Sequence, residues 1–143
     1  MKCFRGASVY VAGAGVTRTD IAFDETVREI GTAPTDAETV ALPEGAVVLP
    51  GFIDPHIHGA GGADAMDGTA AALATISETV AREGTTSFLA TTMTESGEAI
   101  LRALTAVRDC RETPGARLLG VHLEGPFISE TYAGAQPREY IAA

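Results

Sequence analysis

The strongest constraint on the fold is an alternation of strand-like and helix-like segments that fills the C-terminal two thirds of the chain. Residues 47–58, 85–93 and 117–125 are apolar or β-branched runs of the kind that form strands. Residues 69–84 and 96–112 place apolar side chains at the spacing of one helix face. Strands that alternate with helices predict parallel βαβ units with right-handed crossovers. The sequence therefore predicts an α/β fold for this part.

Residues 1–49 have a different character, because short strand-like pieces are separated there by Gly, Pro, Asp and Thr. We predict part of a small antiparallel sheet in this region, and hence two domains, 1–49 and 50–143. Three parallel strands with two helices do not close a barrel, which takes about 250 residues. The second domain is therefore either a small open α/β sheet or the first part of a larger structure.

Composition excludes several classes of partner. The 143 residues carry a formal net charge of −9, whereas a general nucleic-acid or anionic-membrane surface needs a concentrated field of Lys and Arg. No apolar run approaches the length of a membrane span. Cys3 and Cys110 fit no metal or redox spacing, which is typical of free thiols in a reducing compartment. We expect a cytoplasmic protein.

Two of the three histidines, His56 and His58, lie two positions apart at the end of the first apolar run. Side chains at positions i and i+2 of a strand share one face, so both imidazoles should point the same way. Imidazole nitrogens suit a divalent cation such as Zn²⁺, and α/β folds place their active sites at the carboxyl ends of strands. The alternative is a pair of strand-end histidines, one of them hydrogen-bonded to a backbone carbonyl.

The stretch "GVHLEGPF" repeats this arrangement on the third predicted strand, where His122 and Glu124 share a face. Glu124 is a candidate third ligand, although a solvated glutamate at a strand end is the commoner case. We interpret His122, one layer deeper, as a packed or supporting residue.

The Gly-rich stretch "HGAGGADAMDGT" is either a loop that passes close to a ligand or an ordinary flexible connection. We interpret its Asp64 and Asp67 as turn and helix-cap residues rather than ligands. Ser96 is a candidate helix N-cap, and Gly84 suits the residue just after a helix. No serine has the pattern of a nucleophile elbow.

The segment "VVLPGFIDPHIHG" resembles the opening signature of the metal-dependent amidohydrolase superfamily. Three further stretches, "HGAGGADAMDGT", "EGTTSFLATTMTES" and "GVHLEGPFISETYAGAQPREYI", resemble N-acetylglucosamine-6-phosphate deacetylases, and the "HLEGPF" block is the most specific of them. The resemblance runs from about Val47 to the C-terminus.

This resemblance implies a (β/α)₈ TIM barrel flanked by a small β-sandwich. The chain would then supply the first three βα units of an incomplete barrel, preceded by the N-terminal part of the sandwich. The implied reaction is metal-assisted hydrolysis of N-acetylglucosamine 6-phosphate to glucosamine 6-phosphate and acetate. The implied enzyme is a cytoplasmic homo-oligomer that acts on a small amino-sugar phosphate and has no nucleic-acid or membrane partner.

The resemblance also implies roles for individual residues. Glu124 falls on the principal metal ligand, and His56 and His58 fall on a pair that supports a metal position in some members. The implied cofactor is a divalent metal, Zn²⁺ or alternatively Fe²⁺ or another divalent ion. Ala135 and Gln136 fall where the family contacts the sugar, and the second position more often carries His. Glutamine can still form hydrogen bonds there, but it cannot titrate.

The family's other two histidine ligands and its catalytic Asp come from later strands. The resemblance therefore implies no catalytic residue within this chain, and Ala143 would precede the missing groups. We predict that the purified, metal-loaded chain does not deacetylate N-acetylglucosamine 6-phosphate. Release of acetate by this chain alone would contradict the prediction.

Two alternatives stay open at this point. One is another amidohydrolase, acting on cyclic amides or aminoacylated substrates, although those generally lack "HLEGPF". The other is a non-catalytic fragment that folds only with a complementary chain, because an incomplete barrel leaves a strand edge and helix faces unpaired.

Overall fold

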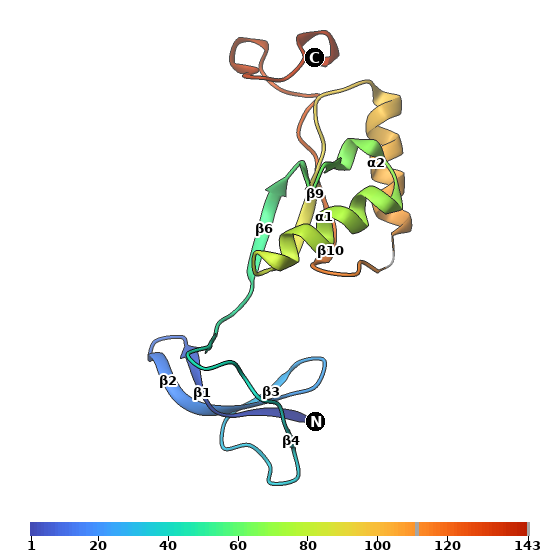
Figure 1. The fold of residues 1–143 in the computed structure, drawn as a ribbon. Helices are drawn as coiled ribbons and strands as arrows, with labels where there is room; N and C mark the ends of the chain where they lie inside the picture. Colours follow the sequence, from blue (N-terminus) through green and yellow to red (C-terminus); the bar gives the residue numbers. More distant parts are fainter. Residues whose placement is uncertain (111, 143) are drawn as a thin grey trace. The chain divides into compact units, whose positions relative to one another are not determined.

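The computed structural model describes residues 1–110 and 112–142, and these form two compact units that divide after Pro50. Each unit is described separately. None of the helices in the described residues is long and apolar enough to cross a membrane. The first unit is a sheet of strands, and the second combines a parallel sheet with two helices (Figure 1).

The N-terminal unit is a mixed sheet rather than the antiparallel sheet that the sequence predicts. Four of its strands follow the order β3-β2-β1-β4, and β5 also pairs with β1. The pairs β1–β2 and β2–β3 are antiparallel, whereas β4 and β5 run parallel to β1. Parallel pairing arises because the chain crosses from β3 to the opposite side of β1 before it pairs again. The strands are β1 (Lys2–Val11), β2 (Gly15–Phe23), β3 (Val27–Gly31), β4 (Glu38–Thr39) and β5 (Val47–Val48).

Asp20 of β2 stabilises an irregular stretch of β1, where the pairing of β1 with β2 shifts register between Phe4 and Ala7. Its carboxylate accepts hydrogen bonds from the backbone N–H of Gly6, at 2.8 Å, and of Ala33, at 3.2 Å. These bonds, the one from Gly6 foremost, keep the pKa of Asp20 below its usual value. A side chain thus satisfies the backbone group that the irregular pairing leaves free.

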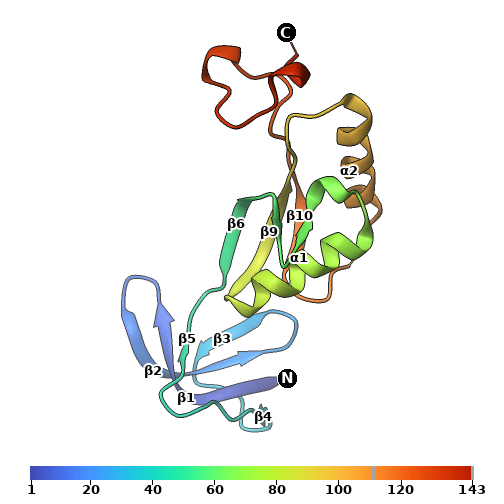
Figure 2. The ribbon, with the colours of Figure 1, turned by 45° about the horizontal axis from the view of Figure 1, so that its top comes forward.

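The second unit confirms the predicted alternation of parallel strands and helices. Strands β6, β9 and β10 form a parallel sheet in the order β10-β9-β6, and helices α1 and α2 connect them on one side of the sheet (Figures 1 and 2). A short hairpin of β7 and β8 and a 3₁₀ turn, η1, precede α1. The elements are β6 (Phe52–Ile57), β7 (Gly59–Ala60), β8 (Ala63–Asp64), η1 (Ala65–Asp67), α1 (Ala70–Arg82), β9 (Thr85–Thr91), α2 (Gly97–Asp109), β10 (Arg117–His122), and the 3₁₀ turns η2 (Glu130–Tyr132) and η3 (Arg138–Tyr140).

The first predicted strand, residues 47–58, needs correction. Val47–Val48 belongs to the N-terminal sheet, and β6 begins only at Phe52. Although the run is apolar, most of β6 is exposed. β6 pairs with β9 along one edge, and the buried side chains concentrate on the central strand β9.

The core of the second unit lies between α1 and β9. Leu73, Ile76 and Val80 recur at helical spacing on α1 and pack with Phe88 and Ala90 of β9. All five side chains are buried, which anchors the central strand and so fixes the position of its carboxyl end.

The caps of the helices are largely as predicted. The Ser96 side chain accepts a hydrogen bond from the Ala99 N–H, at 3.3 Å, and starts α2. Gly84, with φ of 89°, directly follows the C-cap of α1. Asp64 and Asp67 form a capping box on η1, which confirms their structural interpretation. Arg111, which falls in the predicted helix 96–112, lies outside the described residues.

Candidate metal centre

The carboxyl ends of the three parallel strands meet at one edge of the sheet. Ile57 of β6 pairs with Ala90 of β9, and His122 of β10 pairs with Thr91 of β9. Residues that directly follow these positions are therefore neighbours in space, although they are far apart in the sequence.

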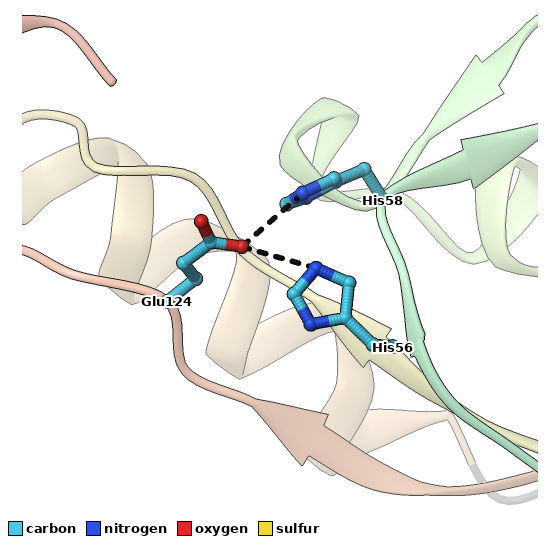
Figure 3. A group of neighbouring side chains, drawn as sticks. All are labelled: His56, His58 and Glu124. Atoms are coloured by element: carbon cyan, nitrogen blue, oxygen red, sulfur yellow. Dashed lines mark ion pairs between the residues drawn. The ribbon is translucent and has the colours of Figure 1, made fainter. Parts of the chain in front are cut away.

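This edge brings together His56, His58 and Glu124 (Figure 3). One potential ligand atom from each residue lies within 4.8 Å of the others. His56 belongs to β6 and His58 follows it, whereas Glu124 comes two residues after the end of β10. The three residues that the sequence selects thus form one cluster, and its side chains are only partly buried, so small molecules can reach it.

The distances from Glu124 to the two histidines are close to those between ligands of one metal ion. Oε2 of Glu124 lies 3.1 Å from Nε2 of His56 and 3.3 Å from Nε2 of His58. Two ligands of a tetrahedral Zn²⁺ with bonds of about 2.1 Å are roughly 3.4 Å apart. Two histidines and one glutamate also leave a fourth position open, as catalytic zinc sites do.

Oε2 of Glu124 lacks an adequate partner within the described part of the chain. It is buried, and although both imidazoles are close, no donor reaches it with the geometry of a hydrogen bond. A buried carboxylate oxygen without a partner is unfavourable. A cation between this oxygen and the imidazoles would satisfy it.

The hydrogen bond between His58 and the backbone of Thr91 also favours a cation beside Glu124. Its Nδ1 lies 3.2 Å from the carbonyl oxygen of Thr91, and a carbonyl can only accept, so Nδ1 carries the proton. With the proton on Nδ1, the lone pair of Nε2 faces the space beside Oε2 of Glu124, 3.3 Å away, rather than the oxygen itself. A cation in that space would be shared by both atoms. Metal-binding histidines commonly donate their other nitrogen to a carbonyl in this way.

His56 is held by its neighbours on the same edge. Its ring makes an edge-to-face contact with His122, at a centroid distance of 4.6 Å. His122 in turn has its Nδ1 3.0 Å from the carbonyl oxygen of Pro55. His122 is therefore packed against His56, as one of the two predicted interpretations has it. Asp54 accepts a hydrogen bond from the backbone N–H of His56, at 3.1 Å, rather than joining the cluster.

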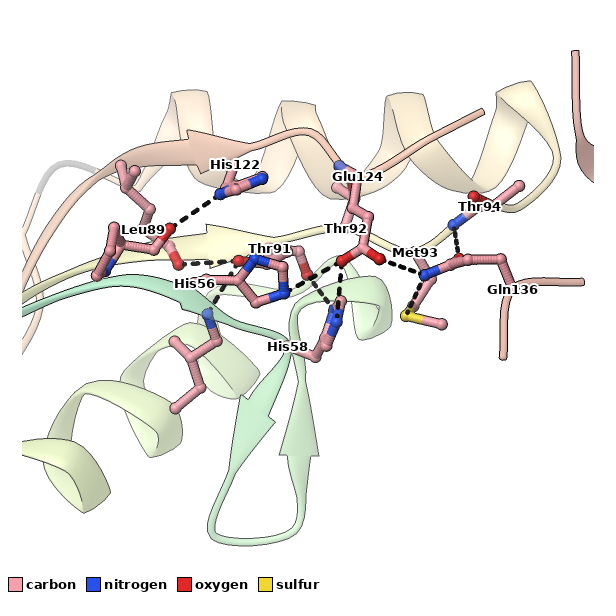
Figure 4. Close-up of polar contacts among 12 residues, drawn as sticks. His56, His58, Leu89, Thr91, Thr92, Met93, Thr94, His122, Glu124 and Gln136 are labelled. Atoms are coloured by element: carbon pink, nitrogen blue, oxygen red, sulfur yellow. Dashed lines mark hydrogen bonds and ion pairs between the residues drawn. The ribbon is translucent and has the colours of Figure 1, made fainter. Parts of the chain in front are cut away.

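Sequence reasoning missed two threonines that position the cluster (Figure 4). The buried hydroxyl of Thr91 accepts from the N–H of Ile57, at 2.9 Å, and its carbonyl binds His58. The hydroxyl of the next residue, Thr92, accepts from the N–H of Glu124, at 3.1 Å. The end of β9 thus holds the histidine side and the glutamate side of the cluster. The only available signal was a run of hydroxyl residues at a strand end.

Of the two predicted sugar contacts, Gln136 lies at the cluster and Ala135 does not contact it. The side chain of Gln136 reaches the cluster and donates from Nε2 to Oε1 of Glu124, at 2.6 Å. Ala135 is exposed in the adjoining segment.

Among known proteins, residues 47–141 match the amidohydrolase family. The chain belongs to the amidohydrolase family. Membership of this family implies a divalent metal, and the cluster of His56, His58 and Glu124 is a possible site for it.

Relatives of this amidohydrolase include two sugar-phosphate deacetylases. The N-acetylglucosamine-6-phosphate deacetylase of Bacillus subtilis (strain 168) is 47% identical over 110 residues, which are 73% of this chain and 28% of the relative. The N-acetylgalactosamine-6-phosphate deacetylase of Escherichia coli O157:H7 is 39% identical over 103 residues, which are 71% of this chain and 27% of the relative. The chain thus spans less than a third of the length of each.

Solved structures agree with this family. The N-acetylglucosamine-6-phosphate deacetylase of Pasteurella multocida has a TM-score of 0.87 at 29% identity, with 99% of this chain and 38% of that chain covered. The Thermotoga maritima deacetylase has a TM-score of 0.79 at 34% identity, covering 97% and 36%. A D-hydantoinase from Bacillus sp. AR9, at 28% identity, has a TM-score of only 0.57, covering 92% and 28%. The deacetylases are thus structurally more similar to this amidohydrolase than that hydantoinase is.

Proposed function

We propose that this chain supplies the first part of an N-acetylglucosamine-6-phosphate deacetylase, which hydrolyses the acetamide to glucosamine 6-phosphate and acetate. In this proposal residues 1–49 are the N-terminal part of a small β-sandwich, and residues 50–143 are the first three βα units of a (β/α)₈ TIM barrel. The observation that carries the proposal is the buried Oε2 of Glu124, which faces Nε2 of both His56 and His58 and has no hydrogen-bond donor among the described residues. The sequence similarity to named deacetylases supports the choice of substrate.

His56, His58 and Glu124 would hold the divalent cation, for which we propose Zn²⁺ because two imidazoles and one carboxylate suit it. When bound, the cation supplies Lewis acidity that polarises an amide carbonyl and makes water more acidic. Glu124 contributes the negative charge of this set. The hydrogen bond between His58 and Thr91 keeps the lone pair of Nε2 directed at the cation position.

The proposed substrate is a small amino-sugar phosphate that approaches from the open side of the cluster. Ala135 and Gln136 are the proposed sugar contacts. A cytoplasmic location remains part of the proposal and rests on the unpaired cysteines as well as on the resemblance. A homo-oligomeric enzyme is also part of it and comes from the resemblance alone. The hydantoinase alternative is less favoured because of its lower structural similarity.

A chimera tests the activity directly. Residues 1–143 would replace the matching part of the Bacillus subtilis deacetylase, and release of acetate from N-acetylglucosamine 6-phosphate would be measured. We expect a Zn²⁺-dependent activity, and a loss of at least about 100-fold in kcat/KM for the same chimera with Glu124→Gln, corresponding to about 2.7 kcal/mol.

Two controls define the result. The Bacillus remainder without residues 1–143 gives the background, and circular dichroism establishes that each chimera is folded. N-acetylgalactosamine 6-phosphate and a hydantoin serve as competing substrates. A folded chimera that prefers either competitor, or that hydrolyses none of the three, would contradict the proposed function.

A further inference from the structure

We propose that Gln136 is a positioning residue, which holds the Glu124 carboxylate in the orientation that the cation requires; this inference rests on the metal centre proposed above. Gln136 follows Glu124 by twelve residues, in the segment after β10. Figure 4 shows its side chain between Glu124 and Thr94. A glutamine at this place therefore connects the metal ligand to the loop that follows β9.

The orientation of the Gln136 amide is fixed by its two partners. The backbone N–H of Thr94 donates to Oε1 of Gln136, at 2.8 Å, so this end of the amide must be the oxygen. The opposite end is then Nε2, which donates to Oε1 of Glu124, at 2.6 Å. The reversed amide would place oxygen against a carboxylate and NH₂ against an N–H. Only one assignment of the amide is compatible with both contacts.

The two carboxylate oxygens of Glu124 have different neighbours. Oε1 accepts from Gln136, while Oε2 faces the histidines. The backbone N–H of Glu124 is held separately by Thr92. The terminal torsion of a glutamate is broad, so the backbone contact alone does not select which oxygen faces the cation position. The hydrogen bond from Gln136 makes that selection.

One contact of Gln136 is weak enough to be exchanged for a substrate contact. Its second Nε2 hydrogen donates to the sulfur of Met93, at 3.8 Å. A sulfur is a weak acceptor, so a sugar hydroxyl could take its place. Gln136 would thus bind substrate through one N–H and hold the metal ligand through the other.

The test measures Zn²⁺ affinity of the 143-residue chain by competition with a chromophoric chelator. Gln136→Met keeps the length of the side chain and removes its hydrogen bonds to Glu124, Thr94 and Met93. Gln136→His restores one donor and one acceptor nitrogen. Thr131→Met is the matched control, because it places the same residue at an exposed position of the same segment without changing the net charge. We expect Gln136→Met to weaken Zn²⁺ binding by about 10- to 100-fold, and Gln136→His to recover at least half of that loss on a logarithmic scale.

The other outcomes separate the two proposals. Wild-type affinity in Gln136→Met, an equal loss in Thr131→Met, or equal losses in Gln136→Met and Gln136→His would overturn the positioning role. Wild-type chain that binds no stoichiometric Zn²⁺ would overturn the metal centre itself, and the positioning role with it. Thermal unfolding of the metal-free variants measures folding independently, and we expect the loss of affinity to exceed what their unfolded fraction explains.

Discussion

Glu124→Gln should lower the affinity of the chain for Zn²⁺ by more than about 100-fold, because it removes the charge from the oxygen that both imidazoles face. The substituted amide keeps the length of the side chain, but a neutral amide oxygen is a poorer Zn²⁺ ligand than a carboxylate. Thermal unfolding with and without Zn²⁺ measures the effect. At 100 times the dissociation constant the metal should stabilise the wild-type chain by about 2.7 kcal/mol, and at the same concentration Glu124→Gln should gain less than about 0.5 kcal/mol.

The matched control for this variant is Glu130→Gln. Glu130 is an exposed glutamate in η2, so its substitution removes the same charge without altering the cluster. This control matters because the chain has a formal net charge of −9 and attracts cations in general. If Glu130→Gln lost as much Zn²⁺ affinity as Glu124→Gln, the binding would be diffuse rather than centred on Glu124.

The positions of the three candidate ligands could be predicted from sequence because they depend on local periodicity. His56 and His58 share a strand face through their spacing of two residues, and Glu124 lies just beyond another parallel strand. Parallel strands in βαβ units direct their carboxyl ends to the same edge. Predicting the cluster therefore required only the correct succession of strands and helices along the chain, which the apolar patterns indicate.

The supporting contacts could not be predicted because they depend on pairing register. The pairing of β6 with β9 shifts between Asp54 and Ile57, and no periodic pattern specifies such a shift. That register decides that Thr91 meets both Ile57 and His58. The segment after β10 has no regular periodicity either, so the contact between Gln136 and Glu124 was also beyond sequence reasoning. The mixed pairing in the N-terminal sheet was missed for a related reason, since two-residue strands carry almost no pattern.

Gly125, which directly follows Glu124, has a backbone conformation and surroundings that leave no room for a side chain. Its φ is 73°, in the left-handed region that side chains disfavour. A Cβ atom at Gly125 would clash with Oγ1 of Thr94 and lie 2.9 Å from Cβ of the same residue, whose side chain is fully buried. Because Thr94 also holds Gln136 through its backbone N–H, the clash would disturb that hydrogen bond and, through Gln136, the hydrogen bond to Oε1 of Glu124.

Gly125→Ala should therefore lower both the stability of the chain and its Zn²⁺ affinity, whereas Gly134→Ala should lower stability alone. Gly134 is the matched control because its φ is 61° and a methyl group there would have no atom of the described residues within 4 Å. Both substitutions incur the backbone cost of about 1 kcal/mol for alanine at positive φ, but only Gly125→Ala displaces Thr94. We expect at least a tenfold loss of Zn²⁺ affinity in Gly125→Ala and less than a twofold change in Gly134→Ala, measured by chelator competition at a temperature where both variants are folded. Equal affinities in the two variants would show that the close approach of Gly125 to Thr94 does not control the orientation of Glu124.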